Sequence, residues 1–568
     1  MTPSEAVHAA YQKIAENEAG AQQPVWISQV PREVALARAA ALEAHPEAAQ
    51  LPLYGKTFAV KDNIDVAGME TTAACPAYAY RAEKSAFIVE ALESAGAVLI
   101  GKTNMDQFAT GLVGTRTPFG ACASVYDSRY ISGGSSSGSG VAVALGMVDF
   151  ALGTDTAGSG RVPAAFNGIY GLKPSRGLFS VTGVVPACRT LDCVSVFTRD
   201  LGLAQSVLTA GAKVDPTDFL SRPWAPGRGA AWHTARPRLG VPKPEQREFF
   251  GDTAAQALYE DFLAKAASRG AQIIGIDYTP FREVANLLYS GPWVAERLAA
   301  IESFAAQHAS AMDPTVAKII TGAAKFSAVD AFRARYRLGE LARAAHAAWD
   351  SMDAMLLPTT GTIFTHAQIA EDPIGRNTQL GYYTNFVNLL DLSALAIPAG
   401  LRANGLPFGV TLIAPAMAEA SLVATAQHLA GEPAAIPQQG WIDVAVLGAH
   451  LSGQPLNHQL TSRGAFLVET ARTAADYRFY ALTGSVPAKP GLRREPGFAG
   501  PGIELEIWRV PSAEFGSFVA AIPPPLGIGT VSLANGASVK CFIAEGYALA
   551  DAREITSFGG WRKYLESL

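Results

Sequence analysis

Two clusters rich in glycine and serine, separated by a largely apolar segment, constrain this chain more than any other feature. The clusters are residues 133–139, Gly-Gly-Ser-Ser-Ser-Gly-Ser, and residues 157–160, Ala-Gly-Ser-Gly. Glycine lets the backbone turn sharply and approach a ligand closely. Serine in such a turn can be a nucleophile, and the neighbouring backbone N–H groups can bind an oxyanion. Because flexible linkers lack an apolar run such as residues 141–152, the pattern predicts two serine-bearing turns joined by a buried segment.

The composition is typical of a globular enzyme with more than one domain. The chain has 568 residues, of which 49% are hydrophobic and 17% charged, so it is too long for one typical domain and too apolar to be disordered. The formal net charge is −5, and no run is rich in Lys and Arg, which argues against nucleic acid or an anionic membrane as a partner. The 5 scattered cysteines fit neither a disulfide framework nor a zinc site, so we expect no metal and no cofactor.

The N-terminal residues lack the features of a targeting segment. Residues 1–20 read as a helix cap followed by an amphipathic helix, which differs from a signal peptide. No apolar run reaches the roughly 18 residues that a membrane span needs. We therefore expect a cytoplasmic protein, whose oligomeric state the sequence leaves open, with a homodimer among the options.

The spacing of apolar residues predicts an α/β protein in which a large domain precedes a smaller one. Residues 1–48 are expected to form a helical N-terminal segment. In residues 49–440, short apolar runs alternate with helical patterns, which favours an α/β sheet. Short strands with Gly and Pro turns in residues 446–568 predict a compact α+β domain.

A serine nucleophile needs a base, and the sequence offers a lysine for that role. None of the 9 histidines lies between residues 132 and 164, although the members of a triad can be distant in sequence. Lys61 ends an apolar run, where burial would lower its pKa toward neutrality and make it a usable base. The alternative is an ordinary solvated surface lysine.

A second serine also has to be considered as the nucleophile. Ser136 lies in Gly-Ser-Ser-Ser-Gly, which matches the nucleophile elbow of α/β-hydrolases. That motif requires a strand directly before it, and residues 127–132 are expected to form a poor strand. The elbow is therefore disfavoured.

Three motifs in order along the chain resemble the amidase signature family. They are Lys61 in Val-Lys-Asp-Asn, the Gly-Gly-Ser-Ser of the first cluster, and Gly-Thr-Asp-Thr-Ala-Gly-Ser-Gly-Arg at residues 153–161. The spacings between them are similar to those of the family, and the resemblance covers roughly residues 25–430. It implies a large domain with a mixed central sheet flanked by helices.

The resemblance also implies a Ser-cisSer-Lys mechanism. Ser159 would be the nucleophile, Ser135 would follow a cis peptide bond and relay a proton, and Lys61 would be the base. The oxyanion would be bound by the backbone N–H groups of Thr156, Ala157, Gly158 and Ser159. Water would then hydrolyse the acyl-enzyme.

Some residues of these motifs have structural interpretations or depart from the family pattern. Asp155 is expected to brace the loop, and Arg161 to pair with a carboxylate inside the fold rather than to contact the substrate. Ser137 and Ala157 stand where glycine is usual in the family, and Gly160 stands where a larger apolar residue is usual. The oxyanion geometry is the part that these departures affect.

Two further features resemble one subgroup of the family, the allophanate hydrolases. Tyr289 and Arg297, in Leu-Leu-Tyr-Ser-Gly-Pro-Trp-Val-Ala-Glu-Arg, resemble a substrate-binding region, because a guanidinium can bind a carboxylate and a tyrosine hydroxyl can donate to it. The alternative is a core tyrosine beside a surface arginine. Residues 446–568 resemble the appended domain of these hydrolases, in which His458 is either a residue of a later step or structural.

The resemblance implies hydrolysis of allophanate (urea-1-carboxylate) to ammonia and carbon dioxide, in urea or s-triazine nitrogen catabolism. The partner would be a small anionic amide, and no biotin-attachment segment is recognised, which indicates the stand-alone form. A general small-amide amidase of the same family is the alternative. An amidotransferase component that works on charged tRNA is disfavoured by the lack of a basic tract.

Overall fold

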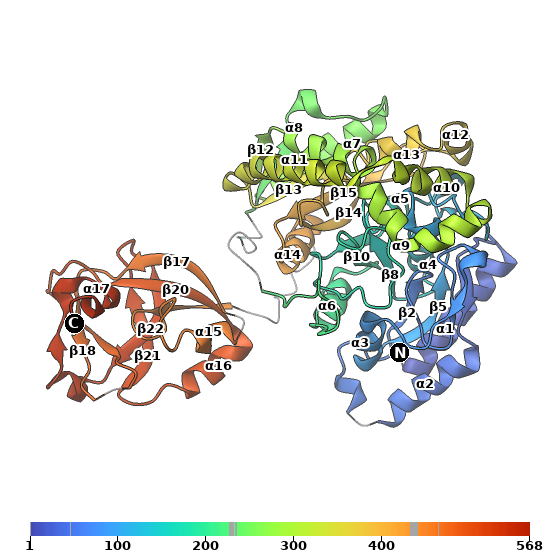
Figure 1. Ribbon diagram of the computed structural model, residues 1–568. Helices are drawn as coiled ribbons and strands as arrows, with labels where there is room; N and C mark the ends of the chain where they lie inside the picture. The colour runs from blue at the N-terminus through green and yellow to red at the C-terminus, as the bar shows by residue number, and fades with distance from the viewer. Residues whose placement is uncertain are drawn as a thin grey trace. The chain divides into compact units, whose positions relative to one another are not determined.

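Two compact units make up the chain in the computed structural model (Figure 1). The structure describes residues 2–45, 47–225, 232, 236–431, 441–463, 465–484 and 486–568. The first unit contains the described residues up to Trp224 and those from 232 to 431, and the second contains those from 441 onward. The domain boundary expected between residues 440 and 446 borders residues 432–440, which lie outside the described residues.

The first unit is built around an eleven-stranded mixed sheet with the strand order β1-β5-β2-β8-β10-β9-β14-β15-β13-β11-β12. Its strands are β1 (Trp26–Gln29), β2 (Thr57–Lys61), β5 (Val98–Thr103), β8 (Phe150–Asp155), β9 (Tyr170–Lys173), β10 (Cys193–Thr198), β11 (Arg238–Pro242), β12 (Gln272–Ile276), β13 (Ala354–Pro358), β14 (Ser393–Leu401) and β15 (Pro407–Ala414). Strand β2 pairs in parallel with β5 and β8, whereas β8 and β10 are antiparallel. The predicted mixed α/β sheet is therefore confirmed.

Helices flank this sheet (Figure 1). They are α1 (Pro3–Ala19), α2 (Arg32–Ala44), α3 (Phe87–Ser94), α4 (Ser137–Ala144), α5 (Val162–Phe166), α6 (Leu201–Gly211), α7 (Thr253–Ser268), α8 (Thr279–Ser290), α9 (Trp293–His308), α10 (Pro314–Thr321), α11 (Ala328–Ala347), α12 (His366–Glu371), α13 (Gly375–Leu380) and α14 (Glu419–Ala430). Helix α4 has no charged residue and is buried along almost its whole length, as expected for the segment between the two serine clusters.

Alternate residues of the central strands pack into different cores. Phe58 and Phe150 stack with their ring centroids 5.3 Å apart and belong to the cluster that includes α3 and α6. Their neighbours Ala59 and Ala151 belong to another cluster, which includes α1, α2 and α4. Because neighbouring strand residues point to opposite faces, the large side chains fill one core while the small ones admit the helices on the other.

Two local predictions differ from the structure. The N-terminal segment contains α1 and α2 as expected, but it also contributes β1, which pairs with β5 at the edge of the sheet. Residues 127–131 form a true strand, β7 (Asp127–Ile131), paired with β6 (Ala123–Ser124). The strand was missed because Asp127, Ser128 and Arg129 are polar and only its last residue, Ile131, is buried, so no apolar pattern marks it.

The second unit has its own core and two small sheets. The five-stranded sheet has the order β17-β20-β16-β22-β21, and the three-stranded sheet has the order β19-β18-β23. The strands are β16 (Trp441–Val446), β17 (Phe466–Arg472), β18 (Tyr477–Ala481), β19 (Pro490–Arg494), β20 (Glu504–Pro511), β21 (Leu526–Ser532), β22 (Ser538–Ala544) and β23 (Arg553–Glu554), with helices α15 (His458–Thr461), α16 (Ser512–Ala520) and α17 (Trp561–Leu565). The smaller α+β domain is confirmed.

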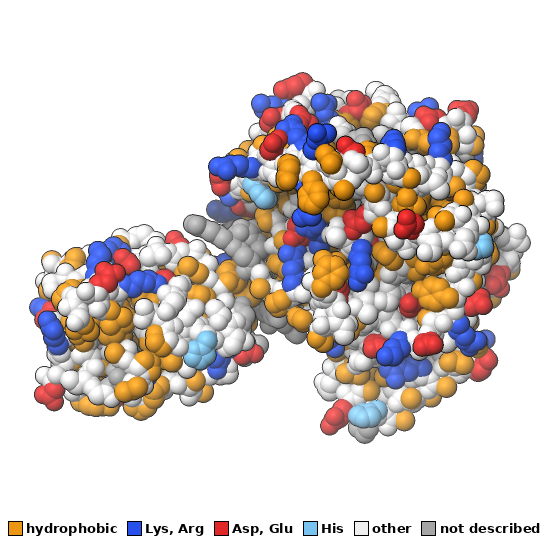
Figure 2. Space-filling model, in the orientation of Figure 1, with side chains coloured by type: hydrophobic (Ala, Val, Ile, Leu, Met, Phe, Trp, Pro, Cys, Tyr) orange, Lys and Arg blue, Asp and Glu red, His pale blue; other side chains and the backbone are white. Residues whose placement is uncertain are grey.

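The surface and the helices give two further observations. On the face that Figure 2 shows, Lys and Arg side chains lie interspersed with Asp and Glu. In the part of the chain that the structure describes, no helix combines the length and the apolar character needed to cross a membrane.

Candidate active site

Lys61 lies at the end of β2 with its side chain fully buried. Its Nζ donates hydrogen bonds to Ser135 Oγ at 2.7 Å and to Thr154 Oγ1 at 2.8 Å. Burial lowers its pKa from 10.5 to about 7, although the charges of three buried carboxylates oppose this shift. A lysine that is partly neutral at pH 7 and bonded to a serine hydroxyl can accept a proton from it.

Ser135 follows the first glycine pair and reaches Lys61 through an unusual backbone. The Gly134–Ser135 peptide bond is cis. The Ser135 carbonyl accepts the N–H of Asp106 at 3.0 Å, and a Cβ on Gly134 would lie 2.2 Å from Asp106 Oδ2. Only glycine therefore fits before Ser135. The competing Ser136 hydroxyl donates to the Thr154 carbonyl at 3.1 Å, so it is engaged by the backbone of β8.

Asp155 braces the loop between β8 and α5, and Arg161 pairs with it inside the fold. The Asp155 carboxylate accepts the N–H groups of Gly158 at 2.7 Å and Gly160 at 3.0 Å. Arg161 Nε lies 2.9 Å from the same carboxylate, with both side chains fully buried. Burial raises the pKa of Asp155, but the charge and hydrogen bonds of Arg161 outweigh it and hold the pKa below its usual value. The expected bracing carboxylate and internal ion pair are both present.

The departures from the family pattern fit the loop geometry. Ser137 begins α4, and neither Ser137 nor Ala157 adopts a positive φ, so glycine is not needed at either place. A Cβ on Gly160 would lie 2.5 Å from the Ser195 side chain, which excludes a larger residue there. Gly158 has φ +137°, and a Cβ on it would lie 2.5 Å from Thr384 Oγ1.

Ser159 lies on this loop and is 3% exposed. Its Oγ donates to the Gly111 carbonyl at 3.3 Å. The N–H of Gly158, one of the four expected oxyanion donors, donates to Asp155. The oxyanion hole of Thr156, Ala157, Gly158 and Ser159 stays a prediction, in which a bracing carboxylate and an oxyanion would compete for this one N–H.

Tyr289 and Arg297 meet although a break separates their helices. Tyr289 is near the end of α8 and Arg297 is in α9, with Gly291 and Pro292 between the helices. The guanidinium carbon of Arg297 lies 5.5 Å from the Tyr289 ring centroid, and Nη2 is 3.5 Å from the Tyr289 hydroxyl. Arg297 is 2% exposed, so the alternative of a surface arginine is wrong.

Arg297 also contacts the loop that reaches Ser159. Its Nη1 donates to the Ala109 carbonyl at 3.3 Å and to Thr110 Oγ1 at 3.1 Å. The next residue, Gly111, accepts the Ser159 hydroxyl. Residues 109–111 therefore connect the arginine with the serine.

The structure adds two polar side chains that the sequence interpretation missed. Thr154 accepts a hydrogen bond from Lys61, and Asp192 accepts one from Thr156 Oγ1 at 2.5 Å. Thr154 meets Lys61 and Thr156 meets Asp192 only because β8 lies between β2 and β10. The one sequence signal for Thr154 was that it directly precedes Asp155, a residue of the recognised motif.

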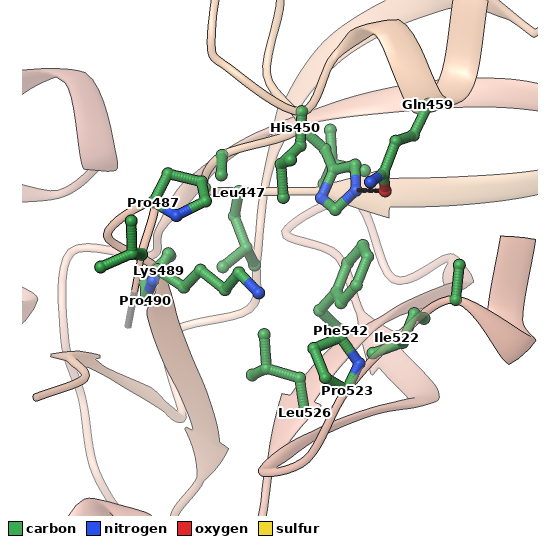
Figure 3. Close-up of a pocket in the computed structure, with 16 residues that line it drawn as sticks. Leu447, His450, Gln459, Pro487, Lys489, Pro490, Ile522, Pro523, Leu526 and Phe542 are labelled. Atoms are coloured by element: carbon green, nitrogen blue, oxygen red, sulfur yellow. Dashed lines mark hydrogen bonds between the residues drawn. The ribbon is translucent and has the colours of Figure 1, made fainter. Parts of the chain in front are cut away.

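In the second unit, the predicted His458 does not line the cavity. His458 is exposed, and its Nδ1 is 2.9 Å from the Pro455 carbonyl oxygen. A cavity of about 200 Å³ is lined instead by His450, Gln459 and Lys489 among mostly apolar neighbours (Figure 3). His450 Nε2 is 3.0 Å from Gln459 Oε1, and burial lowers the pKa of His450.

The composition of the cavity suits a small polar molecule. Figure 3 shows the Lys489 amino group extending toward its centre, opposite the His450 ring. That ring stacks on Phe542 at a centroid distance of 5.0 Å. An ammonium and an imidazole within apolar walls can bind and polarise an anion. Within the described residues, no group of three or more His, Cys, Asp or Glu is arranged to hold a metal ion.

Comparisons with known proteins agree with the two-unit architecture. The model of the amidase family matches residues 5–423, and that of the allophanate hydrolase C-terminal domain matches residues 442–566. The urea amidolyase of Saccharomyces cerevisiae is 42% identical over 96% of this chain and 31% of that protein. The urea amidolyase of Lachancea kluyveri is 40% identical over 100% of this chain and 32% of that protein.

Among solved structures, the allophanate hydrolase of Kluyveromyces lactis is 39% identical, with a TM-score of 0.75, covering 100% of this chain and 97% of that chain. The present chain spans about a third of the length of the urea amidolyases that it matches. The chain belongs to the amidase family, as an enzyme that acts on amides, and carries the C-terminal domain of the allophanate hydrolases.

Proposed function

We propose that this enzyme hydrolyses allophanate, in urea or s-triazine nitrogen catabolism. The observation that carries the proposal is the buried guanidinium of Arg297, whose described hydrogen bonds all go to neutral oxygens. Among the described residues, Asp192 and Glu296 act on this guanidinium through their charge, but neither forms an ion pair with it. A buried cation without such a pair favours an anionic ligand. Allophanate has a carboxylate close to its amide, and the K. lactis structure of the same architecture bears the name allophanate hydrolase.

The proposed mechanism begins with attack by Ser159 on the terminal amide carbonyl of allophanate. The Ser159 hydroxyl turns from the Gly111 carbonyl toward Ser135, which takes its proton and passes its own to neutral Lys61. Backbone N–H groups of the loop stabilise the oxyanion. The proton returns through Ser135 to the leaving nitrogen, which departs as ammonia.

The second half of the reaction uses the same relay. Lys61 and Ser135 remove a proton from water, which attacks the acyl-enzyme and breaks its ester bond. The product is an amine that carries two carboxylates. Loss of carbon dioxide from this product gives carbamate, which releases the second ammonia and a second carbon dioxide.

The substrate assignment is tested by ammonia release from purified protein. Allophanate is compared with the neutral amides malonamide and glutamine, and we expect turnover of allophanate to be highest. Arg297→Ala should lower kcat/KM for allophanate about 100-fold or more, with a smaller loss for malonamide. Arg337→Ala, which removes an exposed arginine of α11, is the matched control and should keep both activities. Good turnover of a neutral amide without turnover of allophanate, or equal losses for both in Arg297→Ala, contradicts the assignment.

We also propose that the cavity of the second unit acts on the dicarboxylated product. Its His450 and Lys489 side chains suit a small dianion and support this role. His450→Ala should delay carbon dioxide release relative to the first ammonia. His458→Ala is the matched control, because that ring is exposed and outside the cavity. An equal ratio of carbon dioxide to ammonia in both variants and the wild type contradicts the role.

A further inference from the structure

A buried carboxylate, that of Asp192, lies beside the loop that bears Ser159, the proposed nucleophile. Strand β10 runs antiparallel to β8 with Cys193 opposite Asp155, so Asp192 lies opposite Thr156. Asp192 Oδ1 accepts the Thr156 hydroxyl at 2.5 Å. Its two oxygens also accept backbone N–H groups of the preceding turn, that of Ala187 at 2.8 Å and that of Cys188 at 3.2 Å.

The same turn is attached to the first turn of α9. Thr190 donates its N–H to Glu296 at 2.6 Å and its hydroxyl to the other oxygen of that carboxylate at 2.9 Å. Cys188 Sγ lies 3.5 Å from the Trp293 carbonyl oxygen. Glu296 directly precedes Arg297, so the turn that Asp192 organises also holds the helix that carries the arginine.

We propose that Asp192 is a positioning residue, which holds the oxyanion loop through Thr156 and helix α9 through the turn at residues 187–190. The inference rests on the proposed function, because it assigns the loop to the oxyanion and α9 to the substrate carboxylate. Asp192 acts through these groups and touches no reacting atom.

A carboxylate suits this position better than a neutral side chain. It accepts three hydrogen bonds through two oxygens, whereas an asparagine would present an NH₂ group to one of these donors. The negative charge has a second effect, because it raises the pKa of Lys61 and so opposes burial. Burial raises the pKa of Asp192 itself, so this effect fades toward low pH as the carboxylate takes up a proton. The other charged groups that act on Lys61 are Asp106 and Asp155, which also raise its pKa, and Arg297, which lowers it.

Two variants and their combination test the inference. Asp192→Asn and Thr156→Val should each lower kcat about 10- to 100-fold, since small displacements of positioned groups are enough for such losses. The kcat of the double variant should be no lower than that of the worse single variant. Both substitutions break the same hydrogen bond, between Thr156 and Asp192, so their effects should not add. The acid limb of the pH profile, where kcat/KM falls as Lys61 is protonated, should also move to lower pH in Asp192→Asn. The reason is that Lys61 loses a nearby negative charge that raises its pKa. Thr156→Val keeps that charge and should leave the limb in place.

Glu419→Gln is the matched control for removing a buried carboxylate. Glu419 is 0% exposed and accepts the N–H and hydroxyl of Ser175, and it does not act on Lys61. This variant should keep the acid limb of the wild type. A kcat of Asp192→Asn within twofold of the wild type, an unmoved acid limb, or losses that multiply in the double variant overturn the inference.

The role of Asp192 can still be decided if Asp192→Asn does not fold, or if allophanate is not the substrate. If Asp192→Asn fails to fold, as judged by its unfolding temperature, an unchanged kcat in Thr156→Val overturns the inference and a 10- to 100-fold loss supports it. If the wild type hydrolyses malonamide and not allophanate, the substrate assignment fails, and the same variants measured on malonamide still decide the role of Asp192.

Discussion

Replacing Lys61 with methionine should abolish activity and stabilise the fold at neutral pH. Lys61 is fully buried, and burial lowers its pKa from 10.5 to about 7. Between pH 7 and pH 10.5, the unfolded chain therefore binds more protons at this side chain than the folded chain does. The free energy of unfolding accordingly rises with pH in that window and is reduced most at and below its lower end.

The structure sets the size of the effect. Deprotonating Lys61 on folding costs about 4 kcal/mol at pH 7 and about 1 kcal/mol at pH 10. Methionine avoids this cost but loses the hydrogen bonds to Ser135 and Thr154, which contribute about 2 kcal/mol together at either pH. Lys61→Met should therefore raise the free energy of unfolding by about 2 kcal/mol at pH 7 and lower it by about 1 kcal/mol at pH 10.

Urea denaturation at the two pH values measures this difference. Wild type and variant share the second unit, so the change in their transitions reports on the first unit. Lys265→Met, on an exposed part of α7, is the matched control and should have the same effect at both pH values. If the difference between Lys61→Met and the wild type does not vary with pH, Lys61 is charged in the folded state and the proposed base is wrong.

Three further outcomes follow from the same geometry. The kcat/KM of the wild type should fall about tenfold per pH unit below pH 7, because protonated Lys61 cannot act as a base. A flat pH profile in ammonia-release assays argues against Lys61 as the base. Gly158→Ala should lower kcat about 100-fold, since its φ of +137° is rare for other residues and Thr384 occupies the space. In contrast, Gly339→Ala, in α11 with open space around it, should keep kcat and add about 0.5–1 kcal/mol to the free energy of unfolding. Arg161→Ala should lower the free energy of unfolding by about 3–5 kcal/mol in urea denaturation, because it leaves Asp155 buried without its ion-pair partner; a loss below about 1 kcal/mol contradicts that role.

Local signals predicted the parts of this molecule that depend on neighbours in sequence. The glycines around Ser135 and Ser159 mark sharp turns, and Asp155 and Arg161 meet within one loop. Local signals do not predict which strands pair when those strands are distant in sequence. Thr154 and Asp192 belong to the site only because β8 has β2 on one side and β10 on the other.

The histidines of the second unit illustrate the same limit. His450 and His458 lie in one short segment, and nothing in the local pattern distinguishes a buried ring from an exposed one. The difference depends on strands and loops that close the cavity from elsewhere in the unit, such as the one that carries Phe542. A local pattern can therefore indicate a segment beside the cavity without indicating which of its side chains lines that cavity.

The loop at residues 109–111 has a consequence for how substrate specificity should be measured. Arg297 bonds to Ala109 and Thr110, and Gly111 accepts the Ser159 hydroxyl. Loss of the guanidinium thus removes a cation and also loosens a loop that contacts Ser159, the proposed nucleophile. Neutral amides should therefore lose some activity in Arg297→Ala, and the role of the charge is given by the ratio of the losses for allophanate and malonamide. Thr110→Val, which removes one bond to the loop and keeps the cation, should lower both activities by the same factor, because only the loop connection changes.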